Sequence, residues 1–306
     1  MKIVTAVDQF LQYIEIIKNY SKHTLENYTR YLTCFLDFTD EEKDITNLSV
    51  TDINNYRVYL NRKTDKKGNK LSIKTQNFRL IAIRALLKYL LKNDHEVLAP
   101  EKIELAKEED RTIDCLEREE LQRLFQAVNL NTRIGKRDRA IIECLYSTGL
   151  RVSELCALNK DQVDFNRKEF AVLGKGKKIR IVFLSDKAAT YTQDYLKSRS
   201  DNYEPLFISH SNRSKNKIDV INQGNPFRLQ RDTVEAIVRK YKTKAGLLKK
   251  VTPHTLRHTF ATEMLKNGAD IRSVQEMLGH SSITTTQLYT HVTNKKLKEI
   301  HNKFHK

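Results

Sequence analysis

Apolar side chains recur three or four residues apart through most of this chain, which is the spacing of amphipathic helices and the strongest constraint on its fold. Two clear stripes lie in the first hundred residues; they are Leu25, Tyr28, Leu32, Phe35 and Leu36, and Leu80, Ile83, Leu87 and Leu90. Ser21 and Ser72 stand where the two helices would begin and can cap them. Glycine and proline are scarce there, so we expect about four helices packed as a bundle.

The helical pattern lapses between Asp94 and Thr112, where charged residues dominate and Pro100 interrupts the chain. We expect this stretch to be extended and to separate two domains. We place an N-terminal helical domain at residues 1–105, a linker at 106–112 and a second domain at 113–306. A chain of 306 residues is long enough for two domains that each bury a core.

One segment of the second domain has the composition of β-strands. Residues 170–173 and 179–184 are rich in β-branched and aromatic side chains, and the turn sequence Gly174-Lys175-Gly176 lies between them. Elsewhere helical spacing returns, with Gly149 ending one helix and the next beginning near Arg151. The predicted fold is therefore mainly α, with two domains and a small antiparallel β-sheet in the second.

The chain is strongly basic, with 55 Lys and Arg against 38 Asp and Glu and a net charge of +17. Residues 1–100 contribute +4 of this charge, so residues 101–306 contribute the remaining +13. Such an excess favours a polyanionic partner, because basic side chains release counterions when they neutralise phosphates. Nucleic acid is the leading candidate and an anionic membrane surface the second. We expect the basic segments 175–180 and 242–250 to contact DNA phosphates.

Cysteine use and hydropathy indicate a compartment. The chain has four cysteines, which are Cys34, Cys115, Cys144 and Cys156. They show no C-x-x-C spacing, which fits reduced thiols in the cytoplasm. The first twenty residues include Asp8 and Glu15 and lack a small-residue cleavage site, so we expect no signal peptide. Because no uninterrupted apolar run approaches the length of a membrane span, we expect a cytoplasmic protein without a membrane partner.

Residues with reactive or hydrogen-bonding side chains gather between residues 253 and 292. Thr252 and Pro253 are suited to begin a helix, and His254 and Arg257 would then share one face near its N-terminus, where an anion is favoured. After a second helix, capped by Asp270 and ended by Gly279, His280 would lie at the helix exit. Tyr289 follows, in what we expect to be a short helix that folds back towards Arg257.

Arginine binds phosphate oxygens bidentately, and histidine exchanges protons near neutral pH. A tyrosine becomes a usable nucleophile only where nearby cations stabilise its phenolate. Together these residue types suggest phosphoryl transfer through a covalent phosphotyrosine, and the sequence shows no set of carboxylates suited to Mg²⁺. We therefore expect neither a metal nor another cofactor.

Simpler interpretations exist for each residue alone. His254, His258 and His280 could bind zinc, although Thr255 stands where a zinc-protease helix would have glutamate. Isolated arginines such as Arg151 are usually surface ion-pair partners. Glu154 could form an intrahelical ion pair, and Tyr289 could pack in a core or an interface. The order and spacing of all these residues, and no single one, favours the catalytic interpretation.

Five segments occur in a recognisable order: "TGLRVSEL", "GKG", "HTLRHTFATEML", "LGHSS" and "LYTHV". This order resembles the tyrosine site-specific recombinases, and most closely the Xer-type integrases. The resemblance implies a SAM-like helical core-binding domain, a mostly helical catalytic domain, and no cofactor. It assigns four residues to the scissile phosphate: Arg151, His254, Arg257 and His280. It also implies that Lys175 protonates the departing 5′ oxygen, that Tyr289 is the nucleophile, and that Glu154 helps orient the site.

The implied reaction cuts and rejoins duplex DNA through a 3′-phosphotyrosine and a Holliday junction, for dimer resolution or for integration and excision of a mobile element. Four protomers would act on two sites, as a homotetramer or with a second recombinase. The 17 residues after Tyr289 would be long enough to dock on a neighbouring protomer, and the loop at 209–227 is longer than the resemblance leads us to expect. A type IB topoisomerase and a DNA-binding regulator without catalysis are the alternatives.

Overall fold

The computed structural model describes residues 1–40, 42–65, 68–108, 114–174, 178–210 and 223–279. The chain divides into two compact units, Met1–Arg111 and Thr112–Lys306. Each unit has its own hydrophobic core. Helices dominate both units, and the strands among the described residues form one two-stranded antiparallel sheet, so the predicted fold class is confirmed.

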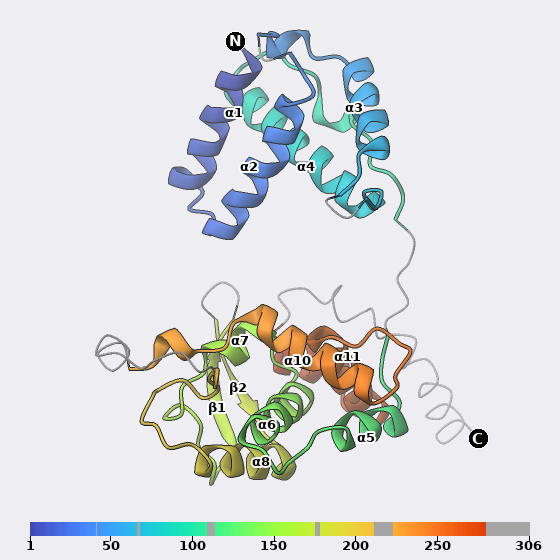
Figure 1. The fold of residues 1–306 in the computed structure, drawn as a ribbon. Coiled ribbons are helices and arrows are strands. Elements are labelled where there is room, and N and C mark those ends of the chain that lie inside the picture. Colours follow the sequence, from blue (N-terminus) through green and yellow to red (C-terminus); the bar gives the residue numbers. More distant parts are fainter. Residues whose placement is uncertain (41, 66–67, 109–113, 175–177, 211–222, 280–306) are drawn as a thin grey trace, which may run out of the picture. The chain divides into compact units, whose positions relative to one another are not determined.

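The first unit is a helical bundle (Figure 1). Its helices are α1 (Ile3–Gln12), α2 (Lys22–Leu36), α3 (Val50–Arg62) and α4 (Ile73–Lys92). The N-caps predicted from the sequence are present, because the side chains of Ser21 and Ser72 accept hydrogen bonds from the backbone amides of Thr24 and Thr75. Helix α4 packs against α1, α2 and α3, and its buried face includes Leu80, Ile83, Leu87 and Leu90.

The segment that follows α4 belongs to this first unit. Ile103 is only 1% exposed, and Val97, Leu98 and Leu105 pack against the same core. The buried amide side chain of Asn77 donates to the carbonyl of Ala106 at 2.9 Å and accepts from its amide at 3.1 Å. The prediction of an extended linker from Asp94 onwards is therefore wrong for this segment. Its apolar residues are interleaved with charges at no regular period, so the sequence pattern did not reveal them.

Most residues of helix α6 (Arg133–Thr148) are buried. It packs against α8 (Asp186–Lys197), α10 (Arg231–Lys244) and α11 (Pro253–Lys266) (Figure 1). The unit also contains α5 (Arg118–Gln126), α7 (Val152–Ala157) and α12 (Ile271–Leu278). This arrangement brings the C-terminal ends of α6 and α12 to the N-terminal half of α11, and the polar cluster described below lies there.

The predicted hairpin is formed by β1 (Glu169–Leu173) and β2 (Ile179–Phe183). The strands pair antiparallel with Phe170 opposite Val182, and both of these side chains are buried. Lys175 at the turn lies outside the described residues, as do residues 211–222 of the long polar loop. In the described part of the chain, no helix has the length and apolar character needed to cross a membrane.

Candidate active site

The junction between α6 and α7 places Arg151. Helix α6 ends at Gly149, whose φ of +60° is a conformation that glycine adopts easily, as the sequence predicts. A side chain here would also collide, since a Cβ atom would lie 2.7 Å from Phe260 and 2.9 Å from Leu278. Arg151 then precedes the first turn of α7, and its side chain remains 29% exposed. A sharp turn against α11 and α12 therefore presents this guanidinium.

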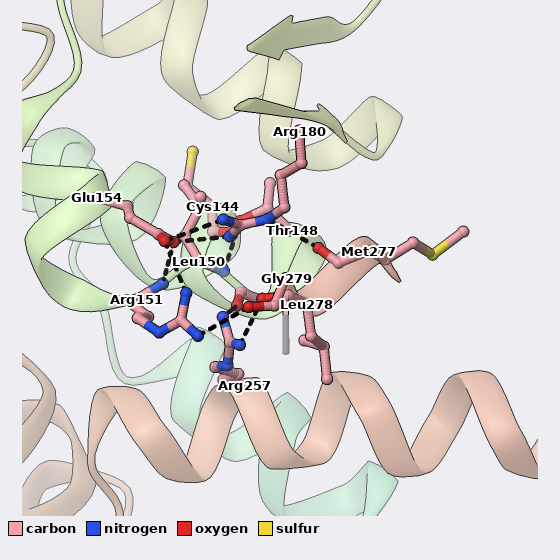
Figure 2. Close-up of polar contacts among 11 residues, drawn as sticks. Cys144, Thr148, Leu150, Arg151, Glu154, Arg180, Arg257, Met277, Leu278 and Gly279 are labelled. Atoms are coloured by element: carbon pink, nitrogen blue, oxygen red, sulfur yellow. Dashed lines mark hydrogen bonds and ion pairs between the residues drawn. The ribbon is translucent and has the colours of Figure 1, made fainter. Parts of the chain in front are cut away.

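Glu154 is a buried carboxylate that receives four hydrogen bonds (Figure 2). Arg151 donates to it from its backbone amide and from Nη1, both at 2.9 Å. Arg180 donates from Nη1 at 3.0 Å and from Nη2 at 2.7 Å. Burial alone would raise the pKa of Glu154, but the hydrogen bonds and charges of Arg180 and Arg151 outweigh it and lower that pKa. Glu154 is therefore an ionised partner shared by two arginines.

Arg180 ends the basic segment 175–180 that we expect to contact DNA phosphates, but its side chain faces the protein. Its side chain is 9% exposed, and besides Glu154 it donates from Nε to the carbonyl oxygen of Met277 at 3.0 Å. Strand β2 offered a signal, because Arg180 occupies the same face as buried Val182. A charged side chain on the inward face of a strand requires a partner, but the sequence does not say which one.

Arg257 on α11 is 4% exposed and bridges the ends of two other helices. Its Nη1 donates to the carbonyl of Gly149 at 2.5 Å, and its Nη2 donates to the carbonyl of Leu278 at 2.7 Å. Arg151 donates from Nη2 to the next carbonyl, that of Gly279, at 3.2 Å. Arginines from α7, β2 and α11 thus converge on the last carbonyls of α12, where the helix dipole is negative (Figure 2).

The N-terminus of α11 has the predicted form, with Thr252 as N-cap and Pro253 in the first turn. His254 follows and is exposed at this end of the helix. Desolvation and the positive charges of Arg257, Arg231 and Arg151 lower its pKa below the ordinary value, although Glu235 opposes them. The lowered pKa favours the neutral imidazole, which can donate one hydrogen bond and accept another.

His258 lies one turn further along α11 and is half-buried. Burial, His254 and Arg257 lower its pKa to about 4. Leu256 is buried in the core of the unit, and Phe260 and Met264 pack against the smaller cluster between α11 and α12. Among the residues described, no group of three or more His, Cys, Asp or Glu side chains is arranged to bind a metal ion.

The structure therefore brings Arg151, Glu154 and Arg257 together and adds Arg180, which the sequence interpretation missed. His254 shares α11 with Arg257. Helix α12 is capped by Asp270 and ends at Gly279 with φ of +64°, as predicted. His280 and Tyr289 lie outside the described residues, and so does the short helix expected around Tyr289.

Comparison with known proteins assigns this arrangement to a family. Residues 114–296 match the Phage integrase family, and residues 7–94 match the N-terminal SAM-like domain of phage integrases. The chain is 37% identical over 304 residues to tyrosine recombinase XerD of Oceanobacillus iheyensis, covering 98% of each chain. It is 36% identical over 300 residues to tyrosine recombinase XerC of Pediococcus pentosaceus, covering 97% of each.

A solved structure supports the fold. The Tn1549 transposon integrase, in complex with transposon right end DNA, superposes with a TM-score of 0.76 at 18% identity, over 98% of this chain and 99% of that one. The two matched domains, the full-length similarity to tyrosine recombinases and the cluster of arginines agree. The chain belongs to the phage integrase family and is an Xer-like tyrosine recombinase, an enzyme of site-specific DNA recombination.

Proposed function

We propose that this enzyme cuts and rejoins duplex DNA by transesterification, with Tyr289 as the nucleophile. One observation supports the proposal most strongly. Arg151 and Arg257, which are far apart in the sequence, donate to the adjacent carbonyls of Gly279 and Leu278. Two guanidiniums are thereby fixed beside the end of α12, and His280 is the next residue in the chain. Such a cluster is suited to a phosphodiester group.

In the proposed reaction, Tyr289 gives up its phenolic proton to solvent, its phenolate oxygen attacks the scissile phosphorus, and the bond to the 5′ oxygen breaks. Lys175 donates a proton to that oxygen, which leaves as a free 5′-OH. Arg151, Arg257, His254 and His280 surround the phosphate, and the guanidiniums stabilise the negative charge that grows on its oxygens in the transition state. A 5′-OH from a partner strand then attacks the 3′-phosphotyrosine, releases Tyr289 and reseals the strand. Glu154 fixes the orientation of Arg151 through the bonds described above.

The proposed partner is double-stranded DNA, because the chain carries a net charge of +17 and an integrase of the same fold was solved with DNA. We propose that four protomers act on two DNA sites through a Holliday junction, as a homotetramer or with a second recombinase, in the cytoplasm. The N-terminal unit, residues 1–105 with a linker at 106–112, would clamp the duplex with the catalytic unit, residues 113–306. Either dimer resolution or mobile-element integration would use this chemistry.

An apolar pocket in the catalytic unit supports the proposed assembly of protomers. It has a volume of about 410 Å³ and lies between the end of α6, strand β2 and helix α11. Its apolar lining includes Ile181, Phe183, Phe260, Met264 and Met277. We propose that the C-terminal segment of a neighbouring protomer docks here, because that segment alternates basic residues with Leu297, Ile300 and Phe304.

Covalent capture tests the proposed chemistry even though the recognised DNA sequence is not specified. Wild type and Tyr289→Phe are incubated with sheared genomic DNA of the encoding organism, denatured, and any DNA attached to protein is sequenced. Wild type should enrich one sequence, and Tyr289→Phe should bind DNA yet yield no adduct. Enrichment of unrelated sequences would instead indicate topoisomerase-like activity. Adducts formed equally by Tyr289→Phe, or by neither protein, would contradict the proposal.

A further inference from the structure

Two guanidiniums share the single carboxylate of Glu154. Each carboxylate oxygen accepts one bond from Arg151 and one from Arg180, at distances between 2.7 and 3.0 Å. Arg180 differs from Arg151 in exposure, since its side chain is 9% exposed and that of Arg151 is 29% exposed. Arg180 therefore faces the protein, while Arg151 retains an accessible edge.

Because Arg180 and Arg151 share Glu154, Arg180 affects the net charge beside Arg151. If Arg151 were the only partner of Glu154, the carboxylate would neutralise the charge that Arg151 offers to a phosphate. With Arg180 on the same carboxylate, the three groups together keep one positive charge. In a buried setting this difference is large, because the effective dielectric constant is well below that of water. The charge available to the phosphate thus depends on a residue that does not reach it.

Arg180 also fixes the end of α12. Its Nε donates to the carbonyl oxygen of Met277, two residues before Gly279. The backbone of Gly279 is packed closely against it, since a Cβ atom there would lie 3.1 Å from both Cδ and Nη1 of Arg180. Strand β2, helix α7 and the end of α12 are therefore joined through one side chain (Figure 2).

We propose that Arg180 is a positioning residue for strand cleavage: by sharing Glu154 with Arg151 and holding the end of α12, it leaves Arg151 charged and correctly placed for the scissile phosphate. This inference rests on the proposed function. Arg180 itself touches neither the phosphate nor the reacting oxygens.

A second arginine–glutamate pair in the same unit provides a comparison. Arg139 donates from Nε and Nη2 to Oε1 of buried Glu143, at 3.0 and 2.8 Å. Here burial outweighs the single arginine and raises the pKa of the carboxyl group. Neither residue shares a described hydrogen-bond partner with Arg151 or Arg257. Arg139→Met is therefore a matched control. It removes a buried ion pair of the same unit but leaves the hydrogen bonds among Arg180, Glu154 and Arg151 in place.

The test measures single-turnover formation of the covalent adduct on a duplex carrying the captured site, at saturating protein, together with the Kd for that duplex. Arg180→Met should slow adduct formation about 10- to 100-fold, by analogy with the loss of a group that orients a metal ligand, with Kd within about twofold of wild type. Arg180→Lys, which keeps the charge, should recover part of the rate. Arg139→Met should react at the wild-type rate at a temperature where it is folded.

Glu154→Gln separates this role from simple stabilisation of the fold. Because the amide has no charge for Arg180 to offset, the double variant Arg180→Met/Glu154→Gln should react faster than Arg180→Met alone. A double variant that is equally slow or slower would overturn the proposal, as would a wild-type rate for Arg180→Met. If wild type itself forms no adduct, the proposed function fails; if wild type reacts and Arg180→Met matches it, only this inference fails.

Discussion

At the scale of single residues, the arginines of this site have different tasks that follow from their surroundings. Arg257 is buried and joins two helix ends through its hydrogen bonds, whereas Arg151 is partly exposed and shares a carboxylate. A guanidinium holds its five N–H donors in a rigid plane and can pair with a phosphate through two of them, whereas a lysine ammonium is a compact charge without such a plane. The residue type is therefore as important here as the charge.

Replacing Arg257 with alanine should slow adduct formation by about 100-fold or more, as expected for loss of a transition-state donor. Arg257→Lys should also be severely slowed, since an ammonium lacks the planar fork with which Arg257 donates to the carbonyls of Gly149 and Leu278. Single-turnover assays on the captured site give both rates. A wild-type rate for either variant would show that the guanidinium has no catalytic part.

The half-buried His258 should make stability depend on pH. Its pKa of about 4 in the folded protein lies below the ordinary value of 6.5. Between pH 4 and 6.5, His258 therefore binds more protons in the unfolded chain than in the folded protein. The contribution of neutral His258 to the free energy of unfolding is complete above pH 6.5 and is lost as the pH falls towards 4. Between pH 7 and 5, wild type should lose about 2 kcal/mol more than His258→Gln. Urea unfolding at both pH values tests this, and equal losses would contradict it.

At the scale of elements, the sequence predicted the helix ends and the hairpin, because residues next to each other in the chain specify them. Gly149 and Gly279 end helices, Ser21 and Ser72 cap them, and segments rich in β-branched and aromatic residues mark the hairpin. The Arg180–Glu154 pair and the packing of Ala106 on Asn77 depend on residues distant in sequence. No local period specifies such pairs, because tertiary packing selects them after the helices are placed.

The turn after α6 can be tested by a pair of glycine substitutions with nearly equal backbone angles. Gly149 and Gly246 have φ of +60° and +63°, but a Cβ atom at 149 would collide with Phe260 and Leu278, whereas at 246 it would meet open space. Gly246→Ala should cost about 1 kcal/mol in backbone strain. Gly149→Ala should cost about 1 to 3 kcal/mol more, from overpacking.

Thermal and urea unfolding of the two variants give these free energies. Adduct assays should also show slower cleavage for Gly149→Ala, because Arg151 lies two residues after the displaced glycine. Equal destabilisation by both substitutions would mean that the packing of Gly149 against α11 and α12 is loose.

At the scale of the whole molecule, the net charge is unevenly distributed along the chain. Residues 101–306 contribute +13 of the net +17, and they contain the arginine cluster and the basic segment that ends α10. The clustered arginines account for a small part of this excess, so most of it is available to contact DNA outside the scissile phosphate. Affinity for DNA should therefore come mainly from many phosphate contacts.

Binding to a duplex that carries the captured site should weaken steeply with salt. If six or more phosphates are contacted, affinity should fall about 1,000-fold or more between roughly 50 and 200 mM salt. Fluorescence anisotropy across this range gives the slope, and Tyr289→Phe should show the same slope because it lacks only a hydroxyl. An affinity that does not change with salt would exclude a phosphate clamp.

The proposed reaction depends on Tyr289 being the nucleophile, and peptide mapping of the covalent adduct identifies the linked residue. Trypsin should release residues 273–295 as one peptide, in which Tyr289 is the single tyrosine. After nuclease digestion, mass spectrometry should find a 3′-linked nucleotide on that peptide, and the cut DNA should end in a free 5′-OH. A nucleotide on any other tyrosine, or a 5′-phosphate linkage to the protein, would contradict the proposed reaction.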